Sequence, residues 1–339
     1  WVKNGDIAGA EWLIIKDRKI VMHEAVGWKD LEDDEAMMLN TIFRIKSMTK
    51  PIVGTCILML AQEGKIRLSD RVSKYLKSFD NKKSREITIK NLLTHTGGFS
   101  KHKRFFIKYN SLKEAVDSIG RVGPQYSPGS HYQYSDCGYA VLGAVVAQVS
   151  GIPLEAFIQA RILTPLGMTD TFCNLTRDDP KRKRVSSTYA NTIFGLWKYW
   201  DNAQPQVMTY FRACAGIYST PIDYAKFLLM WMDMGKFDSK QFLSPDLVRD
   251  AFVCTPFSEK EWDTDLGVIR TCYGMGWLIV CDRNNQFLGF GHTGYDGTLA
   301  RAFPEEDTMV FYFTQSRAGF GPGYFKEFLH LLRANLHLY

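Results

Sequence analysis

An apolar helix that begins at a serine is the feature that most constrains this 339-residue chain. Apolar residues recur at helical spacing after Pro51, which predicts a helix from about Ser47 to Glu63 with one buried face. Gly64 fits the C-terminal cap of that helix. Lys50 follows Ser47 by one turn, so the pattern places an amine beside a hydroxyl at a helix N-terminus. A serine nucleophile needs those conditions, because it requires a proton acceptor and N–H groups for the oxyanion.

The Ser-x-x-Lys spacing is a weak signal by itself, because the chain contains it twice. The second copy, Ser100 to Lys103, follows a glycine pair in a polar, basic segment, and no apolar helix comes after it. That copy is interpreted as a solvated loop. Taken alone, Ser47 is more commonly an ordinary serine at a helix start beside a surface lysine than a nucleophile.

The bulk composition bounds the class of protein. A hydrophobic share of 45% is ample for a core in one extended domain or two packed ones. The longest apolar run, residues 139–149, is too short for the ~20 residues of a membrane span, so no transmembrane segment is predicted. The chain starts at Trp1 without a methionine, which indicates trimming and leaves the compartment open between cytoplasmic and periplasmic or secreted.

Charge and cysteine content exclude several kinds of site. The net charge is +6, and its clearest basic run, Lys181 to Arg184, is interpreted as a solvated loop. No nucleic-acid module accompanies that run, so no nucleic-acid partner is expected. The seven cysteines are scattered, odd in number and free of Cys-x-x-Cys pairs, so the pattern suggests neither a zinc site nor a disulfide framework.

Strand patterns stand at the two ends of the chain and helical patterns lie between them. Glu11 to Ile15 and Lys19 to Ala25 alternate like strands, with a turn at Asp17-Arg18. Later strands are predicted at Tyr273 to Val280, Phe287 to Phe290, Thr298 to Phe303 and Met309 to Gln315. Helices are predicted at about Ala140 to Val149, Leu154 to Leu163, Pro221 to Met234, from Ser244 onward and at Tyr324 to Leu336.

Two further short segments carry candidate chemistry. Tyr134-Ser135-Asp136 lies on a loop that leads into an apolar helix, where a tyrosine taken alone most commonly serves packing. His292-Thr293-Gly294 overlaps a G-x-G-x-x-G match, which we reject because strand-like residues follow it and no helix does. His95 could be a ligand or a base, but a turn-stabilising role is favoured because no second ligand lies at useful spacing.

The order and spacing of Ser47-Met48-Thr49-Lys50, Tyr134-Ser135-Asp136 and His292-Thr293-Gly294 resemble the serine β-lactamase and penicillin-binding protein family, whose signature is S-x-x-K, Y-x-N and K-T-G. The surrounding residues resemble its class C-related branch, which includes family VIII carboxylesterases, D-amino-acid peptidases and class C β-lactamases. The resemblance implies an α/β (α+β) fold, with an antiparallel sheet flanked by helices and a largely helical inserted domain. Residues 1–50 and 266–339 would form the sheet domain and residues 51–265 the insertion, with the active site at their join.

The resemblance also implies roles for individual residues. Ser47 would attack a carbonyl to form an acyl-enzyme, while Lys50 and Tyr134 would manage its proton, and which of the two is the base stays open. The backbone N–H groups of Ser47 and Tyr295 would form the oxyanion hole. Thr293 and Gly294 would support substrate binding. No metal or organic cofactor is expected.

Two departures from the signature favour esters over antibiotics. Asp136 stands where the family usually has Asn, and an ionised carboxylate accepts but cannot donate to an acyl amide oxygen. It could instead hold Lys50 charged, which would favour Tyr134 as the base. His292 replaces the usual Lys, and a histidine is mostly neutral at pH 7.

Together these departures predict a carboxylesterase-like serine hydrolase acting on a small-molecule ester or amide. The alternatives are a β-lactamase or a D-amino-acid peptidase (DD-carboxypeptidase), and a catalytically idle member that binds ligand or assembles with itself. The presence of Ser47, Lys50 and Tyr134 argues against the hypothesis of a catalytically idle member. The sequence predicts neither the natural substrate nor the oligomeric state.

Overall fold

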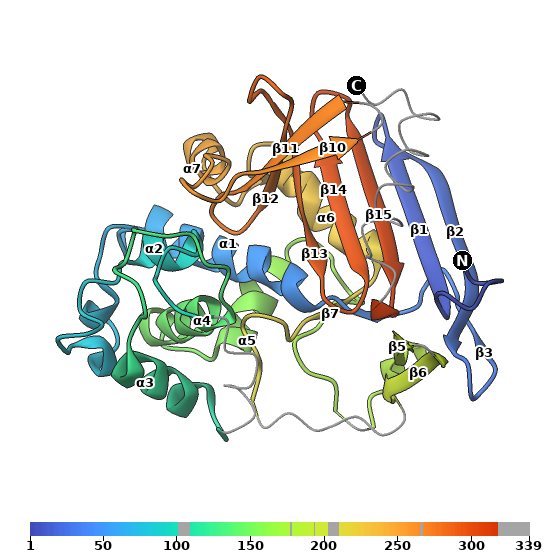
Figure 1. Cartoon of the computed structure of the whole chain (residues 1–339), viewed down its shortest axis with the longest axis horizontal. Coiled ribbons are helices and arrows are strands. Elements are labelled where there is room, and N and C mark those ends of the chain that lie inside the picture. The colour runs from blue at the N-terminus through green and yellow to red at the C-terminus, as the bar shows by residue number, and fades with distance from the viewer. Residues whose placement is uncertain (101–108, 177, 193, 203–209, 265–266, 318–339) are drawn as a thin grey trace.

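The computed structural model describes residues 1–317, apart from 101–108, 177, 193, 203–209 and 265–266. One large twisted sheet and a group of helices beside it make up the architecture (Figure 1). The predicted C-terminal helix, Tyr324 to Leu336, lies outside the described residues.

Within the described residues the sheet has nine strands, and every neighbouring pair in it is antiparallel. Its strand order is β10-β11-β12-β13-β14-β15-β1-β2-β3, so the end of the described chain pairs with its beginning. The predicted antiparallel sheet flanked by helices is therefore confirmed. The strands are β1 (Gly9–Lys16), β2 (Lys19–Asp30), β3 (Glu35–Ala36), β10 (Lys260–Thr264), β11 (Gly267–Tyr273), β12 (Leu278–Cys281), β13 (Phe287–Gly294), β14 (Thr298–Phe303) and β15 (Thr308–Thr314).

Local sequence patterns account for most of these strands. Asp17 and Arg18 both have positive φ, 49° and 63°, which suits the tight turn of the β1–β2 hairpin. The prediction of one strand over Tyr273 to Val280 is wrong, because the chain turns between β11 and β12. Gly274 N–H bonds to the Trp277 carbonyl at 2.9 Å, and Gly276 takes a φ of +94° that favours glycine.

The helices lie between the two groups of strands in the sequence, as predicted. Thr88 starts one of them with a capping box, and Gly151 ends another with a φ of +75°. The helices are α1 (Thr49–Gln62), α2 (Ile89–Leu93), α3 (Leu112–Val122), α4 (Asp136–Ser150), α5 (Leu154–Ile158, continued by a π-helical turn over Gln159–Leu163), α6 (Pro221–Met232) and α7 (Pro245–Ala251). Small antiparallel pairs are β4 (Phe43–Arg44) with β7 (Tyr218–Ser219), β5 (Thr188–Thr192) with β6 (Gly195–Trp200), and β8 (Lys236–Phe237) with β9 (Lys240–Gln241).

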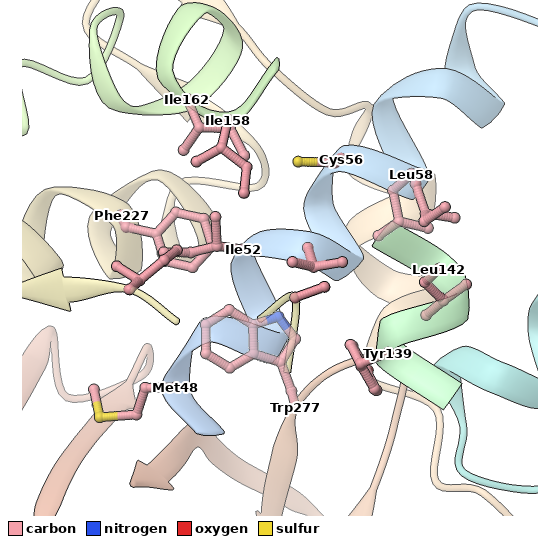
Figure 2. Packing of buried hydrophobic residues seen from close by; sticks show 14 of the residues in the cluster. Met48, Ile52, Cys56, Leu58, Tyr139, Leu142, Ile158, Ile162, Phe227 and Trp277 are labelled. Carbon is pink, nitrogen blue, oxygen red and sulfur yellow. The ribbon is translucent and has the colours of Figure 1, made fainter. Parts of the chain in front are cut away.

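Helix α1 runs through the middle of the hydrophobic core (Figure 2). Every residue from Thr49 to Leu60 is buried, so the prediction of a single buried face is wrong for this helix. Residues of α4, α5 and α6 and the turn at Trp277 surround it, which leaves no side for solvent. A helix buried on all sides is fixed in position, and it therefore makes a rigid base for groups at its N-terminus.

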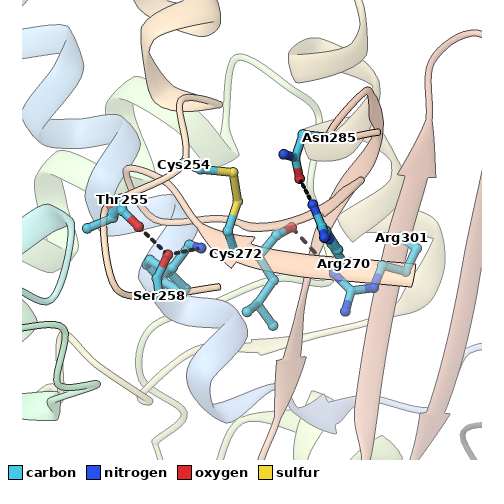
Figure 3. The surroundings of a disulfide bond; sticks show 9 residues. Cys254, Thr255, Ser258, Arg270, Cys272, Asn285 and Arg301 are labelled. Atoms are coloured by element: carbon cyan, nitrogen blue, oxygen red, sulfur yellow. Dashed lines mark hydrogen bonds between the residues drawn. A yellow bond between two sulfur atoms is a disulfide. The ribbon is translucent and has the colours of Figure 1, made fainter. Parts of the chain in front are cut away.

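A disulfide joins Cys254, in the segment after α7, to Cys272 in β11, with the two Cα atoms 5.6 Å apart (Figure 3). The sequence pattern suggested no disulfide framework, so this pairing was not predicted. The spacing of the cysteines carried no sign of it, since the return of the chain from α7 to β11 brings the two thiols together. The other five cysteines are free and buried.

Helix α6 packs against β1, β14 and β15, whereas α1 packs against α4 and α5. The division of the chain into a sheet domain and an inserted domain stays a prediction. Among the described residues, no single helix is long and apolar enough to cross a membrane, although the pair Asp136–Ser150 and Leu154–Leu163, bent by 79°, passes by length and composition.

Candidate active site

The segment that carries Ser47 is a 3-10 turn, Lys46–Met48, placed between β4 and α1. The helix therefore begins at Thr49, two residues later than predicted, and Ser47 lies in the turn before it. Tyr224 donates its hydroxyl to the Met48 carbonyl at 3.0 Å, and the Thr49 hydroxyl accepts the Ile217 N–H at 3.1 Å. These bonds fix the half-buried Ser47 next to the N-terminus of α1.

Lys50 lies beside Ser47, and its side chain is 0% exposed. Its ammonium donates to Ser47 Oγ at 3.0 Å, Asp136 Oδ1 at 2.7 Å and the Cys214 carbonyl at 3.0 Å. An ammonium has three donors, so all three are used. Burial alone would lower the pKa of Lys50, but the Asp136 carboxylate outweighs it and the pKa is raised, which keeps this lysine charged.

Tyr134 and Asp136 reach the site from the start of α4. The N-cap Ser135 accepts the Cys137 N–H at 3.2 Å, which fixes the helix start between them. The Lys50 ammonium lies 4.8 Å from the centre of the Tyr134 ring. Burial raises the pKa of the Tyr134 phenol, and the charge of Lys50 opposes that rise. The structure thus brings Ser47, Lys50, Tyr134 and Asp136 together in one place.

The ring of His95 packs against the ring of Tyr134. It is 2% exposed, has a φ of +57°, and its ring centre lies 4.2 Å from that of Tyr134. Its Nδ1 accepts the Ser135 N–H at 3.1 Å, so Nε2 carries the proton. Burial, with the Lys50 charge, holds the pKa of His95 well below its usual value. These contacts agree with a residue that stabilises the turn.

His292 lies on β13 and lines the site with an uncharged imidazole ring. Its Nδ1–H donates to the Thr293 carbonyl at 2.7 Å, and its Nε2 accepts the Tyr273 hydroxyl at 3.2 Å. Burial, together with the Lys50 charge, lowers the pKa of His292 to about 3, so the ring is uncharged at neutral pH. The site therefore has no fixed positive charge at this position.

The end of β13 approaches the serine turn closely. A Cβ on Gly294 would lie 2.4 Å from the Ile45 carbonyl oxygen, so only glycine fits there. Thr293 is half-buried beside it, and Tyr295, the next residue along, is 60% exposed. All eight predicted site residues thus lie on three segments: the serine turn with α1, the start of α4, and the end of β13 with its following residue.

The family model for β-lactamase matches residues 2–333. The chain belongs to the β-lactamase family. A similar protein is Rv1367c of Mycobacterium tuberculosis, which is 26% identical over 349 residues that cover 92% of this chain and 86% of the relative. The chain is therefore a serine hydrolase of the β-lactamase family.

Solved structures show the same fold. The penicillin-binding protein homologue from Pyrococcus abyssi, described as octameric, has a TM-score of 0.81 at 24% identity, over 98% of this chain and 75% of its own. EstCE1, described as a hydrolase with promiscuous acyltransferase activity, has a TM-score of 0.78 at 21% identity, over 93% and 90%. The predicted resemblance to the β-lactamase and penicillin-binding protein family is therefore confirmed.

Several contributors to the site carried no sequence signal. The Cys214 carbonyl that binds Lys50 is a backbone group, and a backbone acceptor leaves no mark in the sequence. Tyr273 was assigned to a strand without a partner. Within the described residues, one group has metal-ligand spacing, Cys254, Cys272 and Cys281, and the disulfide occupies two of its three sulfurs.

Proposed function

We propose that this β-lactamase-family hydrolase is a carboxylesterase that cleaves small acyl esters through an acyl-enzyme on Ser47. One observation carries the preference for esters: His292 is buried and neutral where a fixed cation would recognise the carboxylate of a β-lactam or a peptide C-terminus. A small ester has no such carboxylate, so it loses nothing at this position.

Asp136 supports the same preference. Its carboxylate accepts a hydrogen bond from Lys50 at 2.7 Å and has no N–H with which to bind an acyl amide oxygen. The acyl side chain of a β-lactam or a D-peptide would meet a negative charge there. An ester with a plain alkyl acyl group would not need that donor.

The proton of Ser47 is proposed to pass to Tyr134. Lys50 has its three N–H bonds committed, so it stays an ammonium and donates to Ser47 Oγ. Tyr134 must first release its own proton to solvent. Burial opposes this step, because it raises the pKa of the phenol, and the nearby Lys50 charge acts in the other direction by stabilising the phenolate. Ser47 Oγ then forms the bond to the carbonyl carbon as its proton moves to Tyr134.

The acyl-enzyme follows from collapse of the tetrahedral adduct. Its oxyanion would be bound by the backbone N–H groups of Ser47 and Tyr295, and losing one such donor costs about 10²–10³ in rate. The C–O bond of the ester breaks, and the alcohol leaves with the proton from Tyr134. Water then attacks the acyl carbon as one of its protons moves to Tyr134. The bond from that carbon to Ser47 Oγ breaks, and Tyr134 returns the proton to Oγ, which releases the acid and regenerates the Ser47 hydroxyl.

The test is a side-by-side rate assay with p-nitrophenyl butyrate and the chromogenic β-lactam nitrocefin. Ser47→Ala serves as the blank, since it removes the nucleophile and leaves the backbone turn unchanged. We expect ester turnover that the variant loses by about 10³-fold or more, with slow or no cleavage of nitrocefin. Faster nitrocefin turnover than ester turnover would favour the β-lactamase or peptidase alternative.

A fluorophosphonate probe separates these enzymes from an idle member of the fold. Labelling of the native chain and not of Ser47→Ala is the expected result. Unchanged ester turnover in Ser47→Ala would refute the assignment of the nucleophile.

A further inference from the structure

An ion pair joins the residue before Ser47 to the residue after Tyr295. Lys46 Nζ lies 3.2 Å from Asp296 Oδ2, and the two side chains are 16% and 0% exposed. Ser47 and Tyr295 are the two residues whose N–H groups are proposed to form the oxyanion hole. The pair therefore connects the two backbones that have to keep a fixed separation.

The backbones already touch on one side of this pair. Gly294 packs against the Ile45 carbonyl so closely that a Cβ would lie 2.4 Å from the oxygen, and Thr298 donates its hydroxyl to the same oxygen at 3.4 Å. These contacts hold the segments before Ser47 and Tyr295 together. The side chains of Lys46 and Asp296 connect the same two segments next to Ser47 and Tyr295.

Lys46 has an unfavourable backbone conformation for a lysine. Its φ is +47°, in the left-handed region where glycine is the least costly residue. A side chain there carries a backbone cost, and its buried ammonium carries a desolvation cost. The ion pair with Asp296 opposes the desolvation cost in part.

We propose that Lys46 and Asp296 form a positioning pair that sets the distance between the Ser47 and Tyr295 N–H groups for the oxyanion. The proposal rests on the proposed acyl-enzyme function of Ser47. Neither side chain needs to touch substrate, since each acts through the backbone of its neighbour in the chain.

Other charged groups surround the pair and determine its titration. Arg44 Nη1 lies 3.9 Å from Asp296 Oδ2, Arg317 Nε lies 3.6 Å from Oδ1, and the Tyr199 hydroxyl donates to Oδ1. Burial alone would raise the pKa of Asp296, but the Lys46 and Arg44 cations hold it below its usual value. The carboxylate thus stays ionised throughout the neutral range.

Lys46 is the member of the pair that titrates near neutral pH. Burial, with the Arg44 and Arg212 cations, lowers the pKa of Lys46 to about 8, although Asp296 opposes the shift. The ammonium is present below that pH, so the ion pair is intact there. As the pH rises through the pKa, the amine becomes neutral and the pair is lost.

The first test measures kcat and KM for p-nitrophenyl butyrate in Lys46→Gly, Asp296→Asn and the double variant. Glycine relieves the left-handed backbone, so Lys46→Gly should fold and melt no lower than the native chain while its kcat falls about tenfold or more. Asp296→Asn should lower kcat by a similar factor. The double variant should lose no more than either single change, because each removes the same pair.

Two controls separate positioning from general damage. Lys46→Arg keeps a cation and should recover most of the kcat lost in Lys46→Gly. Lys29→Gln removes another poorly exposed lysine, 11% exposed and paired with Glu35 at 2.6 Å, and should leave kcat unchanged.

A pH profile gives a readout that a purely structural pair would not change. The ratio of the Lys46→Arg rate to the native rate should be constant at low pH and rise above about pH 8, because a guanidinium does not titrate there. A ratio that stays constant across this range would overturn the proposal, as would a native-like kcat in both Lys46→Gly and Asp296→Asn.

The outcomes distinguish this proposal from the function on which it rests. Loss of activity in Ser47→Ala together with native rates in the pair variants would refute only the pair. A native chain that neither hydrolyses ester nor reacts with fluorophosphonate would refute the proposed function, and the pair would fall with it.

Discussion

Asp136→Asn tests how the charge of Lys50 is maintained. The substitution removes the carboxylate 2.7 Å from the ammonium but keeps an oxygen that accepts the same hydrogen bond. At that distance the Coulomb attraction is ~6 kcal/mol for an effective dielectric constant near 20. The Asp136 side chain is 42% exposed, so solvent screening reduces the loss. We expect the free energy of unfolding to fall by about 2–3 kcal/mol at neutral pH.

The loss should depend on pH with a defined sign. In the native chain the pKa of Lys50 is raised above its unfolded value, so its stabilising contribution is fully present below about pH 10.4 and lost only at higher pH. Without the carboxylate, burial dominates and pushes the pKa below that value. The ammonium then destabilises the fold at low pH, and this cost disappears as the pH rises.

Thermal melts at about pH 6 and about pH 9.5 measure this effect. The difference in Tm between the native chain and Asp136→Asn should be several degrees at the lower pH and smaller at the higher one. Glu86→Gln is the matched control, because its pair with Arg71 has the same 2.7 Å separation while both side chains are 57% exposed. A Tm difference equal at both pH values, or no larger than that of the control, would refute the reasoning.

The remaining predictions concern specificity and the disulfide. His292→Lys should lower KM for nitrocefin relative to that for p-nitrophenyl butyrate, since it adds the missing cation. An unchanged KM ratio would contradict the proposal that the uncharged His292 disfavours substrates with a carboxylate. Cys254→Ser should lower the free energy of unfolding by about 3 kcal/mol, because the bond with Cys272 closes a loop of 18 residues. Reductant should then have no further effect in a denaturant melt, and an equal loss in Cys281→Ser would contradict that assignment.

Local patterns predicted the parts of the fold that depend on neighbouring residues. The β1–β2 hairpin and the strands β14 and β15 follow from alternation and turn residues within about ten positions. The single strand proposed over Tyr273 to Val280 failed, because the turn at Gly276 depends on how β11 and β12 pack and not on an obvious breaker pair. The helix at Ser47 was placed correctly to within two residues, but the burial of its whole surface depends on α4, α5 and α6.

The motifs predicted which side chains gather at the site, and their roles stay predictions. Ser47, Lys50, Tyr134 and Asp136 do lie together, as their order in the family signature implies. The Cys214 carbonyl was not predictable, since a backbone acceptor has no identity in a sequence. The pair of Lys46 with Asp296 was equally hidden, because the chain separates them by most of its length and neither belongs to a motif.

The pairing of β15 with β1 has a consequence for synthesis. The Thr314 hydroxyl donates to the Gly9 carbonyl across a sequence separation of 305 residues. At 5–20 residues per second, a ribosome needs about 15–60 s to make that stretch. During this time the nascent hairpin β1–β2 exposes an unpaired, apolar edge, a recognised template for aggregation. The helical segments emerge before strands β10 to β15 and can collapse without them, so completion of the sheet, and with it of the Ser47 site, should be the last and slowest step of folding.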